Sequence, residues 1–153
     1  MGEPSLRERA IRLLARRDHS RAELARKLAA HGAVEEVEAV LDRMTELDLQ
    51  SDRRYAEAWV RAKAARYGAT RLRSELARRG LDRDTIEEAL AAECPAEEGC
   101  TELERARAIW RGRFSCTPAD AHEWARQARF LHGRGFSTEV IRKLLKENHD
   151  EPA

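Results

Sequence analysis

Apolar residues recur along this chain three and four positions apart, and one short pattern of them occurs twice. Residues 24–32 read LARKLAAHG and residues 72–80 read LRSELARRG, so two leucines four apart precede a glycine in both segments. Residues four apart share one face of an α-helix, and a glycine commonly follows a helix end in the left-handed conformation. The pattern therefore predicts two short helices that bury these leucines and end at left-handed glycines, Gly32 and Gly80.

A weaker third copy reads ARFLHGRG, in which Leu131 precedes Gly135 by four positions. Gln127 takes the place of the upstream leucine, so Trp124 and Ala128 are expected to complete the apolar face of this helix instead. Tryptophan at helical spacing is more typical of a core than of a surface that stacks on nucleic-acid bases. We therefore expect core positions for all three tryptophans of the chain: Trp59, Trp110 and Trp124.

A second apolar stripe precedes each copy, and a third stripe follows it. The alternating β-branched runs that are typical of strands do not occur in the sequence. The chain is therefore predicted to be all-α, with three tandem three-helix repeats over residues 5–49, 52–92 and 101–148. Stacked repeats of this size share a core between neighbours, so we expect an elongated, curved helical ribbon.

Capping residues mark several of the expected helix starts. Ser20 opens a capping box, SRAE, and Asp82 and Ser137 are expected to cap the last helices of the second and third repeats. Thr117 followed by Pro118 indicates the start of the central helix of the third repeat, because proline is favoured at the first helical position. The last helix of the first repeat has no evident cap.

Charge alternates in sign along the chain, although the net formal charge is only +1. Residues 53–80 hold nine basic and two acidic residues, whereas residues 81–104 hold one basic and nine acidic residues. Either neighbouring helices neutralise each other inside the protein, or the basic segments bind a polyanion. Arginine, which suits phosphate contact better than lysine, dominates these segments. The candidate anion-binding residues are Arg16, Arg17, Arg21, Lys27, Arg61, Lys63, Arg66, Arg71, Arg73, Arg78 and Arg79.

No catalytic or metal-binding motif is recognisable. Cys94, Cys100 and Cys116 match neither a disulfide framework nor a zinc spacing, even with His122 nearby, so we expect reduced thiols. His19 is expected to be a turn residue before a helix start. No apolar run is long enough to cross a membrane, and the N-terminus lacks the pattern of a signal peptide. These features predict a cytoplasmic, non-enzymatic protein that needs no metal or cofactor.

Three segments of the chain resemble the RecX family of bacterial recombination regulators. They are RRDHSRAELARKLAAHG at 16–32, SDRRYAEAWVRAKAARYGATRLRSELARRGL at 51–81 and RFLHGRGFSTEVI at 129–141. The resemblance covers nearly the whole chain, in order. The family often has Gly-Pro where this chain has Gly68-Ala69, and two acidic residues where it has Ser51-Asp52. The first departure removes a proline that would define the start of the following helix.

The resemblance implies both a fold and a function. The fold is three tandem three-helix repeats, as the periodicity also predicts. The function is non-enzymatic regulation of recombination, DNA repair and the SOS response. RecX proteins bind the RecA filament on single-stranded DNA, lodge in its groove, and inhibit ATP hydrolysis and strand exchange. On this hypothesis the protein is a monomer whose partners are the RecA filament and single-stranded DNA, and the basic residues named above contact them. The alternative is a helical DNA-binding regulator that acts alone, because each repeat loosely resembles a helix-turn-helix unit.

Overall fold

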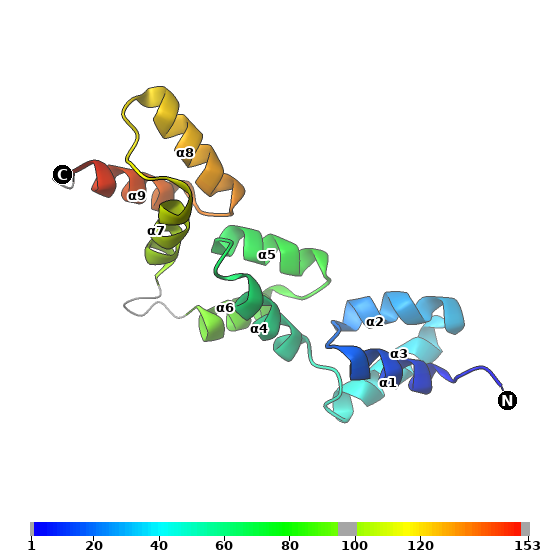
Figure 1. Cartoon of the computed structure of the whole chain (residues 1–153). Coiled ribbons are helices and arrows are strands. Elements are labelled where there is room, and N and C mark those ends of the chain that lie inside the picture. The colour runs from blue at the N-terminus through cyan, green and yellow to red at the C-terminus, as the bar shows by residue number, and fades with distance from the viewer. Residues whose placement is uncertain (1, 95–100, 151–153) are drawn as a thin grey trace. The chain divides into compact units, whose positions relative to one another are not determined.

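The computed structural model describes residues 2–94 and 101–150, and every regular element in these two ranges is a helix (Figure 1). The first repeat contains α1 (Leu6–Arg16), α2 (Arg21–Leu28), the 3₁₀ turn η1 (Ala29–His31) and α3 (Val34–Glu46). The second contains α4 (Asp52–Lys63), α5 (Ala69–Arg78) and α6 (Arg83–Glu93). The third contains α7 (Glu102–Arg113), α8 (Ala121–Gly133) and α9 (Thr138–Asp150). The predicted all-α fold with three helices per repeat is confirmed.

The helices belong to two compact units. Residues 1–59 and 76–89 form the first unit, and residues 60–75 and 90–153 form the second. Each unit therefore combines one outer repeat with part of the middle repeat. The division of the chain into repeats over 5–49, 52–92 and 101–148 remains a prediction, as does the elongated, curved ribbon.

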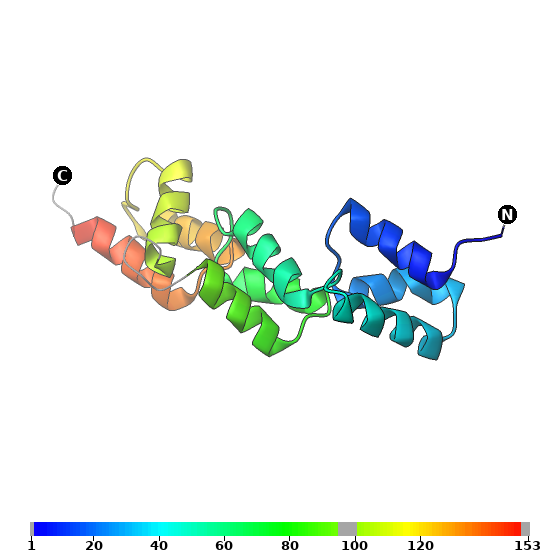
Figure 2. The same cartoon turned by 90° about the horizontal axis from the view of Figure 1, so that it is seen from below.

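In the first unit, α1, α2 and α3 pack against one another around an apolar core (Figure 2). Leu24 and Leu28 are fully buried there, as the repeated leucine pattern predicts. They meet the apolar stripes of the two flanking helices, which begin at Leu6 and Val37. The buried members of this core are Ala10, Leu24, Leu28, Val37, Leu41 and Met44.

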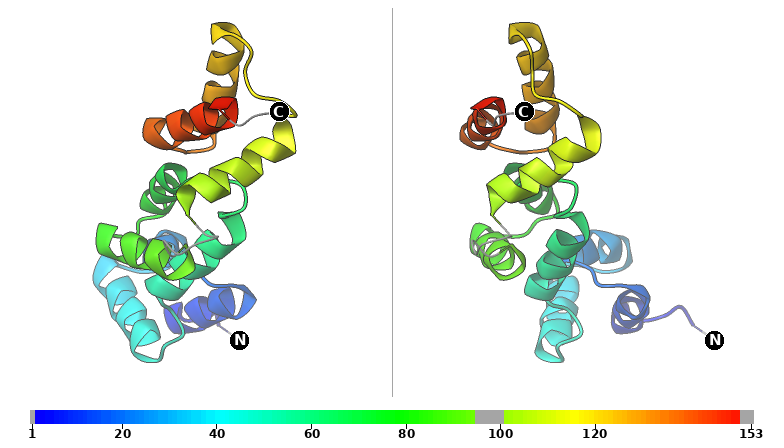
Figure 3. Two further views of the ribbon diagram at one scale, coloured as in Figure 1. Left: turned by 90° about the vertical axis from the view of Figure 1, so that its left-hand side faces the viewer. Right: turned by 60° about the vertical axis from the view of Figure 1, so that its left-hand side comes forward.

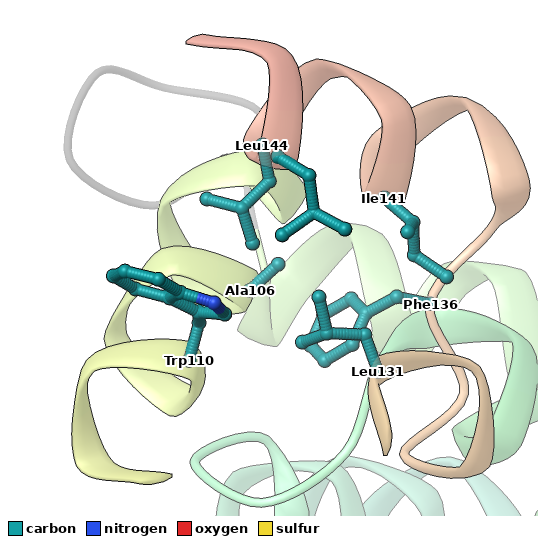
Figure 4. Close-up of a cluster of buried hydrophobic side chains, with 7 residues drawn as sticks. Ala106, Trp110, Leu131, Phe136, Ile141 and Leu144 are labelled. Atoms are coloured by element: carbon teal, nitrogen blue, oxygen red, sulfur yellow. The ribbon is translucent and has the colours of Figure 1, made fainter. Parts of the chain in front are cut away.

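In the second unit, α9 packs against both α7 and α8 (Figure 3). Their core contains Trp110 from α7, Leu131 from α8 and Leu144 from α9, together with Phe136 from the loop before α9 (Figure 4). Ala128 lies partly buried against this cluster, as predicted.

The expectation that Trp124 is a core residue is wrong, because 38% of its surface is exposed. Gln127, a polar interruption of the apolar pattern, is buried in its place. Its side-chain oxygen accepts a hydrogen bond of 2.8 Å from the Trp110 indole, and its amide nitrogen donates to the Cys116 carbonyl at 3.1 Å and to Glu123 at 3.2 Å. A buried amide is tolerated when its donors and acceptor are satisfied in this way.

Three of the predicted helix caps are confirmed. Ser20, Asp82 and Ser137 accept hydrogen bonds from the backbone N–H groups three residues later, over 3.2, 2.7 and 3.2 Å respectively. The cap predicted at Thr117 is wrong, because α8 begins at Ala121 and Asp120 is its cap. The Asp120 carboxylate accepts from the Glu123 N–H at 2.8 Å, and aspartate ranks slightly above threonine as an N-cap.

The glycines after the central helices do not all take the same conformation. Gly80 and Gly135 have φ angles of 81° and 94°, so both are left-handed, and the prediction for Gly80 is confirmed. The same prediction is wrong for Gly32, whose φ of −172° is extended. Here α2 passes into the turn η1 before the chain reaches the glycine. A Cβ added at Gly32 would lie 2.6 Å from a terminal methyl group of Leu6, so the Leu6 side chain would have to shift.

The two left-handed glycines occupy equivalent junctions between successive repeats. In the first unit, Gly80 lies against Ala22 at the start of α2. In the second unit, Gly135 lies against Arg71, near the start of α5. A Cβ added at Gly135 would be 2.6 Å from the backbone nitrogen of Arg71. Each glycine thus places the end of one central helix beside the start of the preceding one. This packing gives a physical reason for the recurrence of the glycine.

Polar contacts at the two junctions are also equivalent. The backbone N–H of Arg21, the first residue of α2, donates to Asp52, the first residue of α4, at 2.7 Å. The backbone N–H of Ala69, the first residue of α5, donates to Glu102, the first residue of α7, at 2.8 Å. In both cases the carboxylate of an acidic residue in the next repeat accepts a hydrogen bond from an N–H group that has no partner within its own helix. The negative charge of the carboxylate also interacts favourably with the positive end of the helix dipole. The Gly68 N–H completes the second junction by donating to the Arg134 carbonyl at 2.7 Å.

Candidate nucleic-acid interface

The candidate basic residues are divided between the two units. Those of the first unit are Arg16, Arg17, Arg21, Lys27, Arg78 and Arg79. Those of the second unit are Arg61, Lys63, Arg66, Arg71 and Arg73. Their local surroundings differ in the contacts that they make and in their exposure to solvent.

Arg17 and Lys27 gather around one carboxylate in the first unit. The Arg17 guanidinium hydrogen-bonds to the Glu23 carboxylate, and the Lys27 ammonium lies 3.6 Å from it. Burial opposes ionisation of Glu23, but the Arg17 hydrogen bond and the surrounding positive charges outweigh it and lower the pKa of this carboxyl. The positive charge of Arg17 is therefore largely neutralised by Glu23 within the protein.

Arg21 links α2 to the acidic helix α3. Its guanidinium lies 2.8 Å from Glu38 and 2.7 Å from Asp42. Both acidic partners are well exposed, so we assign little stability to the pairs. The first interpretation of the charge pattern, mutual neutralisation of neighbouring helices, therefore holds for Arg21.

Two candidates of the second unit are held by contacts within the protein. Arg61 of α4 makes two hydrogen bonds to Glu93 of α6, over 3.1 and 2.7 Å. The Arg71 guanidinium lies 3.9 Å from the centre of the Tyr67 ring and donates to the Gly133 carbonyl at 2.9 Å. Arg71 thus helps to hold the junction between the middle and third repeats.

The other candidates around α5 are more open to solvent. Arg73 and Arg78 are exposed on α5, and Arg66 is exposed in the turn before it. Lys63 is half-buried, and the half-buried Arg79 stacks its guanidinium 4.9 Å from the centre of the Trp59 ring. Arg66, Arg73 and Arg78 are therefore exposed members of the middle-repeat set.

Arg16 and Lys27 line a groove between α1 and the end of α2, together with two arginines absent from the candidate set. These are Arg9 and Arg12, which also belong to α1. Arginines at 9, 12 and 16 are spaced three and four apart, so they form one stripe on the helix. The sequence shows this spacing, but the same helix also carries an apolar stripe, and the candidate set does not include Arg9 and Arg12.

His19 is buried rather than merely a turn residue, since only 2% of its surface is exposed. Its Nδ1 lies 2.9 Å from the Arg17 carbonyl, which can only accept, so Nδ1 carries the proton in the neutral ring. Its Nε2 is then an acceptor for the Lys27 ammonium at 3.0 Å. Burial is the main reason that the pKa of His19 is lowered, and the nearby positive charges of Arg17 and Lys27 add to the effect.

We expect the protein to lose stability as the pH falls through the range in which histidine titrates. Because the folded pKa of His19 is lowered, the unfolded chain binds a proton more readily, and the contribution of neutral His19 is lost below about pH 6.5. Melting temperatures measured between about pH 7.5 and pH 5.5 should fall more for the native protein than for His19→Asn. Equal falls in the two proteins would contradict this role.

The structure supplies no metal site for the cysteines in the ranges it describes. Within these ranges no group of three histidine, cysteine, aspartate or glutamate side chains is placed to hold a metal ion. Cys94 is half-buried and Cys116 is exposed, while Cys100 lies outside the described residues. Among the described helices, none combines the length and apolar character that a membrane crossing needs.

Comparison with known proteins places all three repeats in one family. The sequence models for the first, second and third three-helix domains of RecX match residues 7–44, 51–90 and 101–145. The regulatory protein RecX of Leptothrix cholodnii is 50% identical over 93% of this chain and 88% of its own length. The regulatory protein RecX of Chromobacterium violaceum is 43% identical over 96% of this chain and 93% of its own. These relatives are named as regulators, not as enzymes.

Solved structures agree with the fold. A crystal structure of RecX from Lactobacillus salivarius superimposes with a TM-score of 0.78 at 20% identity, over 94% of both chains. A second crystal structure of a regulatory protein RecX gives a TM-score of 0.76 at 20% identity, over 93% of this chain and 71% of the other. Together with the matches of all three domain models and the identity to the two relatives, this shows that the chain belongs to the RecX family of regulatory proteins.

Proposed function

We propose that this protein restrains the RecA recombinase by binding in the groove of the RecA filament on single-stranded DNA. Bound there, it lowers ATP hydrolysis and strand exchange, and so limits recombination and the SOS response. It acts as a monomer in the cytoplasm, without a cofactor. The observation that carries the proposal is the match of all three RecX three-helix domains, in order, within one chain.

The charge distribution supports contact with DNA and protein together. The basic segment 53–80 is followed directly by the acidic segment 81–104, so cationic and anionic segments alternate along the chain. Cationic groups would meet phosphates, and acidic groups would meet basic protein surfaces. Arg73 and Arg78 are the middle-repeat arginines that we assign to this contact, because both are exposed on α5.

The test is the DNA-dependent ATPase activity of the host RecA, measured with and without the protein. We expect suppression at protein concentrations well below that of the DNA nucleotides, because a filament-bound regulator acts on many RecA subunits from few sites. The variant Arg73→Glu/Arg78→Glu should inhibit less while keeping the helical circular dichroism of the native protein. Its salt slope for single-strand binding should become shallower, by roughly 0.7 for each phosphate that the variant no longer neutralises.

Arg43→Glu/Arg53→Glu is the matched control. It changes the net charge equally, at two exposed arginines that pair with Glu46 and Glu57. If inhibition disappears whenever single-stranded DNA is in excess, the regulator that binds DNA alone becomes the better explanation. A lower melting temperature of the Arg73→Glu/Arg78→Glu variant, with an unchanged salt slope, would mean that these arginines serve the fold instead.

A further inference from the structure

The groove between α1 and the end of α2 has a wall of positive charge. Its volume is about 350 Å³, and its charged lining comes from Arg9, Arg12, Arg16 and Lys27, with His31 beside them. No acidic side chain belongs to the lining. All of these residues lie in the first unit, so the groove is formed entirely within one compact part of the protein.

The three arginines of the groove form a row along α1. Residues 9, 12 and 16 span about 10 Å of helix axis at 1.5 Å per residue. Like charges three and four positions apart repel each other on a helix surface, so this row destabilises α1 slightly unless an anion neutralises it. Within the described part of the chain, no carboxylate lies within ion-pair distance of Arg9, Arg12 or Arg16.

Other basic residues of the chain do have such partners. Arg17 pairs with Glu23, Arg21 pairs with α3, and Arg61 pairs with Glu93. Among the groove cations and the carboxylates that the structure describes, only Lys27 makes such a contact, since its ammonium lies 3.6 Å from Glu23. The three arginines of the groove are therefore cations that no carboxylate of the described residues neutralises, which favours an anionic ligand.

We propose that this groove binds the phosphodiester backbone of single-stranded nucleic acid. Arginine presents a planar fork of donors that matches phosphate oxygens, and a row of three can follow successive phosphates of a strand. The rest of the lining is Pro4, Leu13 and Leu28, so apart from the imidazole of His31 the groove offers no aromatic ring on which a base could stack. Recognition therefore rests on phosphate contacts, which makes binding independent of base sequence and strongly dependent on salt.

An acidic peptide is the less suitable occupant. Arginine clusters also recognise acidic motifs, but a docked peptide usually adds backbone hydrogen bonds to a strand edge or apolar anchors that fill a hydrophobic groove. The described residues contain no strand, and the apolar part of the lining is confined to Pro4, Leu13 and the buried Leu28. This inference extends the proposed function to the first repeat. Its test contains DNA without RecA, so the two proposals can fail separately.

The experiment measures binding of a fluorescein-labelled oligothymidylate by anisotropy, at several salt concentrations between about 50 and 200 mM. For Arg12→Glu/Arg16→Glu we expect binding about 25-fold weaker at about 0.1 M salt, since each phosphate left without its arginine removes a factor of about five there. The salt slope should become shallower by roughly 1.4 for two phosphates. Arg12→Lys/Arg16→Lys keeps the charge and should retain most of the affinity.

Arg43→Glu/Arg53→Glu is again the control, because it changes the net charge equally outside the groove and should keep the native salt slope. Glutamate near the C-terminal end of α1 interacts unfavourably with the helix dipole, so Arg12→Glu/Arg16→Glu could lower the melting temperature. In that case Arg12→Gln/Arg16→Gln, which removes the two charges without adding negative ones, provides the same comparison. Equal weakening by the groove and control variants would overturn the proposal in favour of a net-charge effect. Native DNA binding by the groove variant, combined with a loss of RecA inhibition, would overturn it in favour of an acidic protein surface.

Discussion

Gly135→Ala is expected to lower the free energy of unfolding by about 2–5 kcal/mol. A residue with a side chain costs about 1–2 kcal/mol in the left-handed region, and the φ of Gly135 is 94°. The new Cβ would also overlap Arg71 at the junction between the middle and third repeats, where its backbone nitrogen is only 2.6 Å away. Overpacking of this kind costs about a further 1–3 kcal/mol. Urea unfolding followed by circular dichroism measures the change.

Gly133→Ala is a matched control two residues away. Gly133 is the last residue of α8, and an added Cβ there would meet nothing within 4 Å. Alanine stabilises a helix relative to glycine by up to about 1 kcal/mol, so this variant should be as stable as the native protein or slightly more stable. Similar destabilisation in both variants would show that the junction does not depend on a missing side chain at Gly135.

Leu76→Ala is expected to cost about 2–5 kcal/mol, and Leu28→Ala a similar amount. Both leucines are fully buried, and removing three carbons from such a site loses transfer free energy and leaves a cavity. The two substitutions test the repeated leucine pattern in different repeats. Chemical denaturation of each variant measures the loss.

Leu47→Ala is the control for these substitutions, because 40% of the Leu47 surface is exposed and it lies just after α3. Its cost should stay below about 0.5 kcal/mol, as for most surface substitutions. A cost this small at Leu28 or Leu76 would argue that the shared spacing of the two segments is a coincidence of helical periodicity.

The features that were predicted correctly from the sequence depend on neighbours along the chain. Leu24 and Leu28 lie four apart, and this spacing alone places them on one face of a helix. The caps at Ser20, Asp82 and Ser137 bond to N–H groups three residues away, so a short segment contains both partners. The family resemblance also follows the order of residues, and the domain models confirm it over all three repeats.

The incorrect predictions concern contacts with residues distant in sequence. Trp124 was assigned to the core because tryptophan is large and apolar, yet nothing in its own helix decides what covers it. Gln127 is buried because Trp110, 17 residues earlier, offers it a hydrogen-bond donor. Gly32 is extended because α2 continues into the turn η1 before the chain reaches the glycine, and the repeated leucine-glycine spacing does not reveal this turn.

The helical repeats, their apolar faces and the alternation of charge can all be predicted from the order of residues, because each is a periodic feature of the chain. Which charges are neutralised depends instead on how the helices pack. Arg21 meets Glu38 and Asp42, 17 and 21 positions away, whereas Arg16 shares a groove with Lys27 and no carboxylate. Electrostatic attraction depends on the distance between two groups and on their exposure to water, and both are set by how the helices pack.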